Sequence, residues 1–274
     1  MPDGLYIKLI YRANVRNKLN LKNPITFNEK LQWLKINDRN TLYTKLADKY
    51  EVREYVKERI GEEYLIRLIG IYNNFDDIDF DSLPTQFVLK TTHDSGGVVI
   101  CKDKSKFEIK KARRKINKSL ARNYYYTGRE WQYKNIKPRI ICEKYMIDEN
   151  YNILKDYKFY CFNGEIKCIL VVSEREKNTK LDFFDENFKI MPFNKFGYEN
   201  SNSDINKPEN LEEMMNIVRA LSKGMIHVRI DLYEDKGKIF FGEFTFHDFS
   251  GIKKFEPEQY DELFGNWIDL SKVK

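Results

Sequence analysis

The segment HVRIDLYEDKGKIFFGEFTF, residues 227–246, contains two strand-like runs joined by a short connection with one glycine. In the first run polar residues alternate with apolar ones, so Arg229 and Asp231 lie on the same face of a strand. The connection is expected to be a three-residue loop, Lys236–Lys238, with glycine at the position that needs a positive φ. The segment therefore predicts an antiparallel hairpin with one polar face.

In this hairpin two carboxylates face each other. With a three-residue loop, Asp231 stands opposite Glu243 and Arg229 stands opposite Thr245. Facing carboxylates destabilise a sheet by up to about 1 kcal/mol unless a cation lies between them. Mg²⁺ is commonly held by one or two carboxylates together with substrate phosphates, so it fits this need. A solvated strand face on which Arg229 neutralises its neighbours fits equally well, and the hairpin alone leaves both interpretations open.

A second candidate site follows the strand Phe87–Lys90, where a polar connection leads through Ser95, Gly96 and Gly97 back into a strand at Val98. Backbone N–H groups of a glycine loop can close over phosphate oxygens, and a lysine at its base adds positive charge. The loop is not a P-loop, because it leads into a strand and lacks the GK[ST] ending. By itself a glycine pair more often makes a simple turn.

The other segments predict a mixture of single helices and hairpins. Capping patterns open helices at Thr26 with Glu29, at Asp48, and at Ser105 with Glu108. Further elements are expected as strands over 65–72, 98–101 and 139–147, a hairpin of 157–162 and 166–172 around Asn163 and Gly164, a helix over 208–223 and a helix from about Pro257. This order predicts an α+β fold with largely antiparallel sheet.

Composition sets the broad class. The 274 residues are 42% hydrophobic and 33% charged, which is typical of a folded globular chain and not of a disordered one. The net charge of +6 suits phosphorylated ligands, an anionic membrane surface or nucleic acid, and does not choose among them. The four cysteines form no CxxC motif and are expected to be buried reduced thiols. With no signal peptide or apolar run of spanning length, we expect a cytoplasmic protein.

Taken together, the motifs form an ordered set: Asp48-Lys49, Phe87–Lys90 with His93-x-Ser95-Gly96-Gly97, Glu143–Met146, Asp156-x-Lys158, Arg229-x-Asp231 and Gly242-Glu243-x-Thr245. This set resembles the ATP-grasp superfamily, and in particular its TupA-like branch, named for teichuronopeptide synthesis. The resemblance implies two α+β subdomains that clasp a nucleotide. It divides the chain into a helical N-terminal segment, 1–45, which replaces a full Rossmann-like domain, a lid subdomain, 46–146, and a metal-binding catalytic subdomain, 147–274.

The resemblance also implies roles for individual residues. Lys49 and Lys90 would contact ATP phosphates, with Lys90 and Arg229 serving the transferred phosphoryl group. The other nucleotide-binding residues would be the glycine loop Ser95, Gly96 and Gly97, the hinge residues Glu143, Lys144, Tyr145 and Met146, and the pair Asp156 and Lys158. Mg²⁺ would bind Asp231, Glu243 and Thr245. Many ATP-grasp enzymes carry asparagine where Thr245 stands, so this sequence departs from the family pattern for a second metal ion.

The implied activity is that of an ATP- and Mg²⁺-dependent ligase that forms an amide through an acyl phosphate. The resemblance places it in bacterial capsule or cell-wall polysaccharide synthesis, where it would attach an amino acid or amine to a uronate or peptide carboxylate. Expected partners are ATP and those two substrates, and peripheral membrane association is compatible with the charge. Loops beside the ATP-contacting segments supply candidate acceptor residues: His93, Arg175, His247, Ser250 and Gly251.

Two alternatives stay open. A kinase on the same fold would use the same lysines and metal ligands but pass the phosphoryl group to a sugar hydroxyl. From a different class, a nucleic-acid-binding protein could use a basic helix that contains Lys110, Lys111, Arg113, Arg114, Lys115 and Lys118. That helix carries no aromatic stacking partner among its basic residues, so we do not expect a nucleic-acid ligand.

Overall fold

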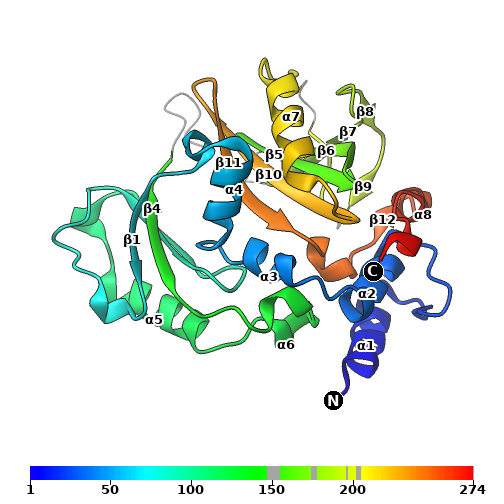
Figure 1. Ribbon diagram of the computed structural model, residues 1–274, viewed down its shortest axis with the longest axis horizontal. Helices are drawn as coiled ribbons and strands as arrows, with labels where there is room; N and C mark the ends of the chain where they lie inside the picture. The colour runs from blue at the N-terminus through cyan, green and yellow to red at the C-terminus, as the bar shows by residue number, and fades with distance from the viewer. Residues whose placement is uncertain (147–154, 174–177, 196, 202–204, 274) are drawn as a thin grey trace. The chain divides into compact units, whose positions relative to one another are not determined.

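The computed structural model describes residues 1–146, 155–173, 178–195, 197–201 and 205–273 (Figure 1). The chain divides into two compact units. The first, here called the six-stranded unit, combines Met1–Arg39 with Leu154–Lys274, and the second, the four-stranded unit, is Asn40–Ile153. The N-terminal helices therefore belong to the same unit as the C-terminal half of the chain.

The six-stranded unit is built on one antiparallel sheet with the strand order β11-β10-β5-β6-β7-β8. A second small sheet pairs β9 with β12. The elements of this unit are α1 Asp3–Val15, α2 Phe27–Asn37, β5 Lys155–Phe162, β6 Glu165–Ser173, β7 Lys180–Phe184, β8 Ile190–Met191, β9 Asn194–Lys195, α7 Leu211–Ser222, β10 His227–Asp235, β11 Lys238–Thr245, η5 Asp248–Gly251, β12 Phe255–Glu256, α8 Gln259–Asn266 and η6 Leu270–Lys272.

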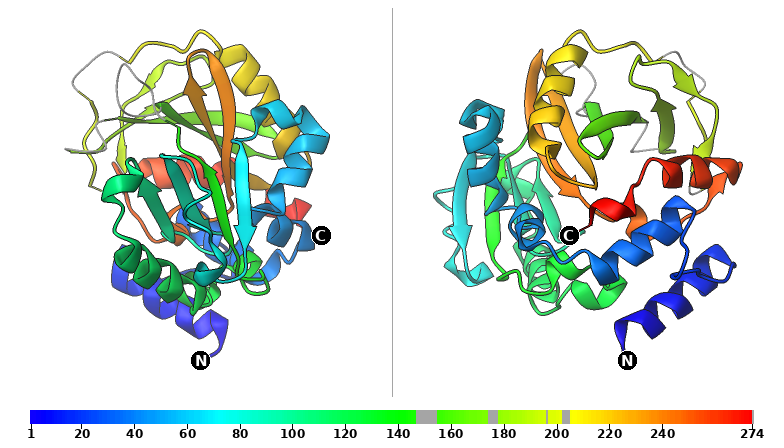
Figure 2. Two further views of the ribbon diagram at one scale, coloured as in Figure 1. Left: turned by 90° about the vertical axis from the view of Figure 1, so that its left-hand side faces the viewer. Right: turned by 45° about the vertical axis from the view of Figure 1, so that its right-hand side comes forward.

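The core of this unit lies against the sheet. Helix α7 packs on β6 and β10 with Met214, Val218 and Leu221 fully buried, and Figure 2 shows it in yellow beside the orange strands. Helices α2 and α8 close an aromatic cluster in which Phe27 contacts Phe264 edge to face. Because β10 is an inner strand with packed neighbours, its predicted polar face is buried instead of solvated.

The predicted hairpin forms, and Asp231 pairs with Glu243 as expected. The predicted three-residue connection is wrong. Lys236 and Gly237, with φ of 50° and 76°, form a two-residue turn, and Asp235 pairs directly with Lys238. A β-bulge between Asp231 and Leu232 shifts the register back by one residue. The extra residue is glycine for a steric reason, since a Cβ at Gly242 would lie 2.9 Å from the carbonyl oxygen of Asp231.

The four-stranded unit contains an antiparallel sheet with the order β1-β4-β2-β3. Helix α5 packs on it through Ala112 and Ile116, which join a cluster with Phe87, Leu89 and Ile140. Its elements are α3 Thr41–Ala47, α4 Val52–Ile60, η1 Glu62–Tyr64, β1 Leu68–Tyr72, η2 Phe75–Asp77, β2 Phe87–Thr91, β3 Val98–Cys101, η3 Lys104–Lys106, α5 Ile109–Leu120, α6 Tyr125–Gly128, η4 Trp131–Tyr133 and β4 Ile140–Lys144.

Capping patterns in the sequence predicted one helix start correctly and placed two others too early. The capping box of Thr26 and Glu29 is present at the start of α2. Asp48 does not open its predicted helix directly: its Oδ1 accepts from the backbone N–H of Tyr50 over 2.8 Å, which caps a turn before α4 begins at Val52. Ser105 is likewise bound by Asp103 within η3, and α5 starts later, at Ile109.

The mixed helices and antiparallel sheets confirm the predicted α+β class. The hairpin of β5 and β6 turns at Asn163 and Gly164, both with positive φ, as predicted. Among the described residues no helix has the length and apolar character needed to cross a bilayer.

Candidate active site

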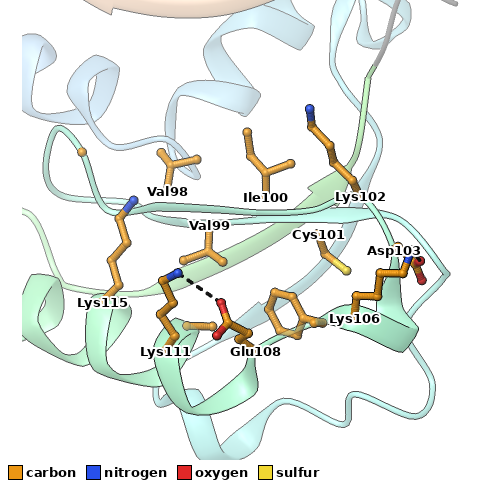
Figure 3. Close-up of a pocket in the computed structure, with 13 residues that line it drawn as sticks. Val98, Val99, Ile100, Cys101, Lys102, Asp103, Lys106, Glu108, Lys111 and Lys115 are labelled. Carbon is orange, nitrogen blue, oxygen red and sulfur yellow. Dashed lines mark hydrogen bonds and ion pairs between the residues drawn. The ribbon is translucent and has the colours of Figure 1, made fainter. Parts of the chain in front are cut away.

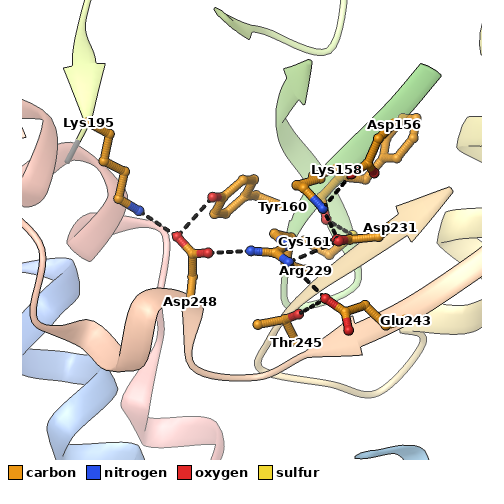
Figure 4. A network of polar contacts seen from close by, with 11 residues as sticks. Asp156, Lys158, Tyr160, Cys161, Lys195, Arg229, Asp231, Glu243, Thr245 and Asp248 are labelled. Atoms are coloured by element: carbon orange, nitrogen blue, oxygen red, sulfur yellow. Dashed lines mark hydrogen bonds and ion pairs between the residues drawn. The ribbon is translucent and has the colours of Figure 1, made fainter. Parts of the chain in front are cut away.

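Arg229 is buried in the six-stranded unit and binds carboxylates from two strands and a loop (Figure 4). Its Nε donates to Oδ1 of Asp231 over 2.7 Å and its Nη2 donates to Oδ2 over 2.9 Å. Its Nη1 donates to Oδ1 of Asp248, and Nη2 also lies 3.3 Å from Oε1 of Glu243. The chain itself therefore places a cation between the facing carboxylates of β10 and β11.

The charges in this cluster stabilise one another. Burial alone would raise the pKa of Asp231, but Arg229 and Lys158 outweigh it and hold the pKa below its usual value. Burial acts the same way on Asp248, whose pKa Lys195 and Arg229 hold well below the usual range. Burial would lower the pKa of Arg229, and the two aspartates raise it instead. Asp231 and Asp248 are therefore ionised at neutral pH.

The cluster extends into a row of alternating charge. Lys158 on β5 binds Asp231 and lies 2.9 Å from Oδ2 of Asp156. At the other end Nζ of Lys195 donates to Oδ2 of Asp248 over 2.8 Å. The phenol of Tyr160 donates to the same oxygen over 2.9 Å. Each buried charge thus has an opposite charge beside it, which is the condition for keeping ions in a protein interior.

Glu243 and Thr245 form the open end of this cluster. The Glu243 side chain is 47% exposed, whereas that of Asp231 is 1% exposed. Thr245 Oγ1 lies 3.4 Å from Oε1 of Glu243. Within the described part of the chain, Oε2 of Glu243 has no hydrogen-bond partner. Glu243 therefore combines an exposed side chain with free acceptor capacity.

A cavity of about 400 Å³ lies beside Lys158 and Arg229 in the same unit. The two cations form part of its wall, and apolar side chains and two hydroxyl-bearing ones form most of the rest: Leu170, Val172, Thr179, Leu181, Tyr198 and Phe249. Positive charge at one wall and apolar surface elsewhere suit a ligand with one anionic group.

Phe249, which lines the cavity, begins a backbone segment in an unusual conformation. Phe249, Ser250 and Gly251 have consecutive positive φ values of 44°, 57° and 60°. Helix α2 holds this segment: Nε2 of Gln32 donates to the carbonyl of Ser250 over 2.9 Å, and Nζ of Lys35 donates to the same carbonyl over 2.8 Å. Consecutive left-handed residues cost free energy, and such strain is concentrated at functional sites.

The candidate acceptor histidines are both buried. His247 precedes this segment in the chain, and burial together with nearby Lys35 holds its pKa well below the usual value. His93 belongs to the four-stranded unit, where its Nε2 donates to the carbonyls of Ser119 and Arg122, each over 3.2 Å. This geometry favours a role for His93 in holding its loop. Arg175 lies outside the described residues.

Lys90 and Glu143 meet in the four-stranded unit. Nζ of Lys90 lies 2.7 Å from Oε2 of Glu143, and Nη1 of Arg53 donates to Oε1 over 3.2 Å. Glu143 is buried, while the Lys90 side chain is 23% exposed. The carboxylate therefore holds both cations at the surface of the sheet. Lys144, which ends β4, is exposed, and Tyr145 and Met146 follow it outside the strand, both half-buried.

The glycine loop is tied down at its base. Nζ of Lys49 donates to the carbonyl of Asp94. The Asp94 carboxylate is buried and accepts from Ser119 and Thr91, and Arg122 lies 2.8 Å from it. Ser95 and Gly96 at the tip are exposed. The predicted phosphate-binding elements Lys49 and the loop are thus in contact within one unit.

Comparison with known protein families gives one match, which covers most of the chain. The family described as TupA-like ATPgrasp matches residues 29–269. The chain belongs to the TupA-like ATP-grasp family. The predicted family is confirmed, and membership makes the chain an ATP-dependent enzyme.

Solved structures of ligases are similar to this TupA-like chain at low sequence identity. A D-alanine–D-alanine ligase from Helicobacter pylori is 12% identical, with a TM-score of 0.47, over 88% of this chain and 69% of that one. The corresponding ligase from Bacillus anthracis is 17% identical, with a TM-score of 0.45, over 90% and 72%. The ATP-grasp ligase PsnB, complexed with minimal precursor, is 12% identical, with a TM-score of 0.43, over 81% and 62%. A search of curated proteins found no match.

The carboxylates of the TupA-like chain fit Mg²⁺ only when other ligands complete its shell. No group of three or more His, Cys, Asp or Glu side chains among the described residues could hold a metal ion alone. A carboxylate offers about four acceptor positions, and Asp231 uses three of them for Arg229 and Lys158. Glu243 retains more free acceptor positions than Asp231. Such a partial donor set matches Mg²⁺ that arrives with phosphate oxygens.

Several residues of this cluster were not predicted from the sequence. Lys195 ends the two-residue strand β9 and Asp248 begins the short helix η5, and the two residues meet only through the fold. In the sequence Gln32 and Lys35 look like ordinary polar residues of a helix. In the structure both are buried and bind the segment at Ser250. The sequence signal for Lys195 was weak: a lysine between two aromatic residues, Phe193 and Phe196.

Proposed function

We propose that the chain forms an amide between an amine, such as an amino acid, and a uronate or peptide carboxylate, in the synthesis of a bacterial capsule or cell-wall polysaccharide. The observation that carries the chemical part is the charged cluster around Arg229 next to a cavity with two cations in its wall. The polysaccharide setting rests on the family resemblance.

In this proposal the carboxylate substrate binds in the cavity beside Lys158 and Arg229. Its oxygen attacks the terminal phosphorus of ATP, the bond from that phosphorus to ADP breaks, and an acyl phosphate forms. The amine then attacks the acyl carbon, phosphate leaves, and the amine loses a proton. Arg229 is already charged and held by Asp231 and Asp248, so it can stabilise the developing negative charge without rearranging.

In this proposal the nucleotide-binding residues are those that the family resemblance implies. Lys49, Lys90 and the glycine loop 95–97 contact phosphate oxygens, and the segment Glu143–Met146 lies along the adenine. Lys90 is suited to this because its charge stays partly exposed while Glu143 fixes its position. Asp156 and Lys158 bind at the ribose or the phosphates. Exposed backbone N–H groups at a glycine-bearing tip add neutral donors to these cations.

Glu243, through its exposed carboxylate, and Asp231 would hold Mg²⁺. When bound, Mg²⁺ would neutralise negative charge on the phosphates. Thr245 contributes through its hydroxyl, which already lies beside Glu243. The proposed domain roles follow: the four-stranded unit supplies the lid residues and the six-stranded unit the metal and substrate residues.

Titration calorimetry with ATP, with and without Mg²⁺, tests the nucleotide and metal roles. Wild type should bind ATP more tightly with Mg²⁺, and Glu243→Gln and Asp231→Asn should lose that difference. Glu262→Gln, an exposed change on α8, is the matched control and should behave as wild type. Absence of ATP binding to wild type, or full Mg²⁺ dependence in both variants, contradicts the proposal.

A kinase that phosphorylates a sugar hydroxyl would use the same cluster, so the reaction type needs its own test. Hydroxylamine traps an acyl phosphate as a hydroxamate but does not react with a sugar phosphate. Incubation with ATP, Mg²⁺ and candidate uronates or acidic peptides should give a hydroxamate and equimolar ADP. Phosphorylated sugar without hydroxamate would identify the kinase instead.

A further inference from the structure

A groove in the four-stranded unit is lined by none of the residues assigned above to nucleotide or substrate binding, except for the tip glycine Gly96 (Figure 3). It has a volume of about 800 Å³ and runs between strand β3 and helix α5. The floor is apolar and is formed by β3 together with Phe107 and Ala112. Four lysines line it: Lys102, Lys106, Lys111 and Lys115.

Strand β3 is an edge strand. Among the described residues it pairs with β2 alone, so the backbone N–H and C=O groups of its outer edge have no strand beside them. The strand sequence Val98-Val99-Ile100-Cys101 contains no charge, and the Ile100 side chain is 51% exposed. Proteins usually protect such an edge with a charge or proline within the strand. An apolar edge without either is suited to pairing with an added strand.

The surroundings of the groove are strongly positive. The solvent-facing side of α5 carries six exposed basic residues, namely Lys110, Lys111, Arg113, Arg114, Lys115 and Lys118. Within the groove Lys111 lies 3.1 Å from Glu108, and Lys106 lies 3.4 Å from Asp103. Lys115 has no ion pair in the part of the chain that the structure describes. In Figure 3 the side chains of Lys111 and Lys115 rise from α5 toward β3.

We propose that this groove binds an extended acidic peptide segment, which adds a strand to β3 and places carboxylates beside the lysines. The open edge accounts for the extended backbone, the apolar floor for alternate apolar side chains, and the lysines for the negative charge. A second copy of the chain fits poorly, because the same lysines would face each other. Phe107 is the one aromatic side chain in the lining, so stacked nucleic-acid bases find little support.

The test uses the full chain and a dye-labelled, end-capped hexapeptide of alternating glutamate and valine, followed by fluorescence anisotropy. Wild type should bind it, and Lys111→Glu with Lys115→Glu should weaken binding at least about tenfold. The matched control reverses two exposed lysines of the other unit, Lys8→Glu with Lys22→Glu, and should bind as wild type.

A second peptide with N-methyl groups on alternate backbone nitrogens keeps the charges and removes strand pairing. It should lose binding about as completely as the double lysine variant. Equal binding of the two peptides, equal weakening by the control variant, or complete displacement by heparin or by phosphatidylglycerol vesicles would each overturn the proposal in favour of unspecific attraction. The inference is independent of the proposed ligase function, and ATP binding by the Lys111/Lys115 variant should be unchanged.

Discussion

Asp231 and Asp248 bind different nitrogens of one buried guanidinium, that of Arg229. Asp231 lies on the strand β10 itself, whereas Asp248 comes from the loop that follows β11. Asp248 also neutralises Lys195, so it is shared by two buried cations. The position of Arg229 therefore depends on a residue that does not take part in the proposed chemistry.

We expect Asp248→Asn to lower the free energy of unfolding by about 3 kcal/mol, because removal of one member of a buried charge cluster leaves its partners uncompensated. Urea unfolding followed by circular dichroism measures the change. Glu262→Gln, which neutralises an exposed carboxylate of the same unit, should change the free energy by less than about 0.5 kcal/mol. A similar small change for both variants would show that Asp248 does not hold the cluster together.

The two loop glycines should respond differently to alanine. At Gly97 a Cβ would lie 1.8 Å from Thr91 Oγ1 and 2.3 Å from Ser119 Oγ, so Gly97→Ala should displace the buried anchor at the base of the loop. At Gly96 the space is open and φ is 96°, so alanine there meets only backbone strain. We expect losses of about 3 kcal/mol for Gly97→Ala and about 1 kcal/mol for Gly96→Ala in thermal or urea unfolding.

Equal losses for the two variants would mean that the buried contacts around Asp94 do not fix the loop. Measured ATP affinity gives an independent comparison. Because Gly97→Ala disturbs the anchor, its affinity should fall more than that of Gly96→Ala.

The predicted register of the central hairpin is right for a reason that the sequence did not reveal. The two-residue turn at Lys236 and Gly237 is one residue shorter than predicted, and the bulge at Gly242 restores the difference. The length of the turn and the bulge each shift the register of the hairpin by one residue. The sequence therefore predicts the combined shift more readily than either contribution. Asp231 and Glu243 face each other because these two departures cancel.

Alternation along β10 identified which side chains share a face but not what covers that face. Arg229 and Asp231 were expected on a solvated surface or at a metal site, and they are buried among partners from β5 and η5. Long-range partners such as Lys195 carry no periodic signal, because the contact depends on how the small β9–β12 sheet packs. The motifs therefore predict the family and the candidate residues. Which of these residues form ion pairs with one another can be read only from the fold.

His227 should make the protein sensitive to mild acid. Burial lowers its pKa from 6.5 to about 3, and its Nδ1 donates to the carbonyl of Cys161 over 3.0 Å. The unfolded chain binds a proton below the ordinary pKa and the folded chain does not, so stability falls as the pH decreases from 6.5 toward 3. The slope from one such histidine reaches about 1.4 kcal/mol per pH unit.

His227→Gln removes the titration and keeps an N–H donor for Cys161. Urea unfolding between about pH 7.5 and pH 4.5 should give a shallower loss of stability for the variant, by up to about 1 kcal/mol per pH unit. The comparison at the upper end of this range measures the packing change alone, because the imidazole is then neutral in both states. Parallel curves for the two proteins would rule out His227 as the titrating group.

The four cysteines should be inert in the folded protein. Cys101, Cys142, Cys161 and Cys168 are all buried free thiols, as predicted. Burial raises the pKa of Cys142 and of Cys161 to about 12, which leaves almost no thiolate at neutral pH. We expect less than about one thiol per chain to react with Ellman's reagent under native conditions, and four after unfolding in guanidinium. Rapid reaction of the folded protein would contradict this burial.

Thr245 should set how tightly the cluster holds Mg²⁺. Its hydroxyl lies 3.4 Å from Glu243, and many ATP-grasp enzymes carry asparagine at the matching position. An asparagine carbonyl is a longer and stronger oxygen ligand, so Thr245→Asn should lower the Mg²⁺ concentration for half-maximal ATP binding by about threefold. Thr245→Val, which keeps the shape and removes the oxygen, should raise that concentration. Wild type and both Thr245 variants could instead reach half-maximal ATP binding at the same Mg²⁺ concentration while Glu243→Gln shifts that concentration. Thr245 would then not be a metal ligand, and Glu243 would be the one residue of β11 that binds the ion.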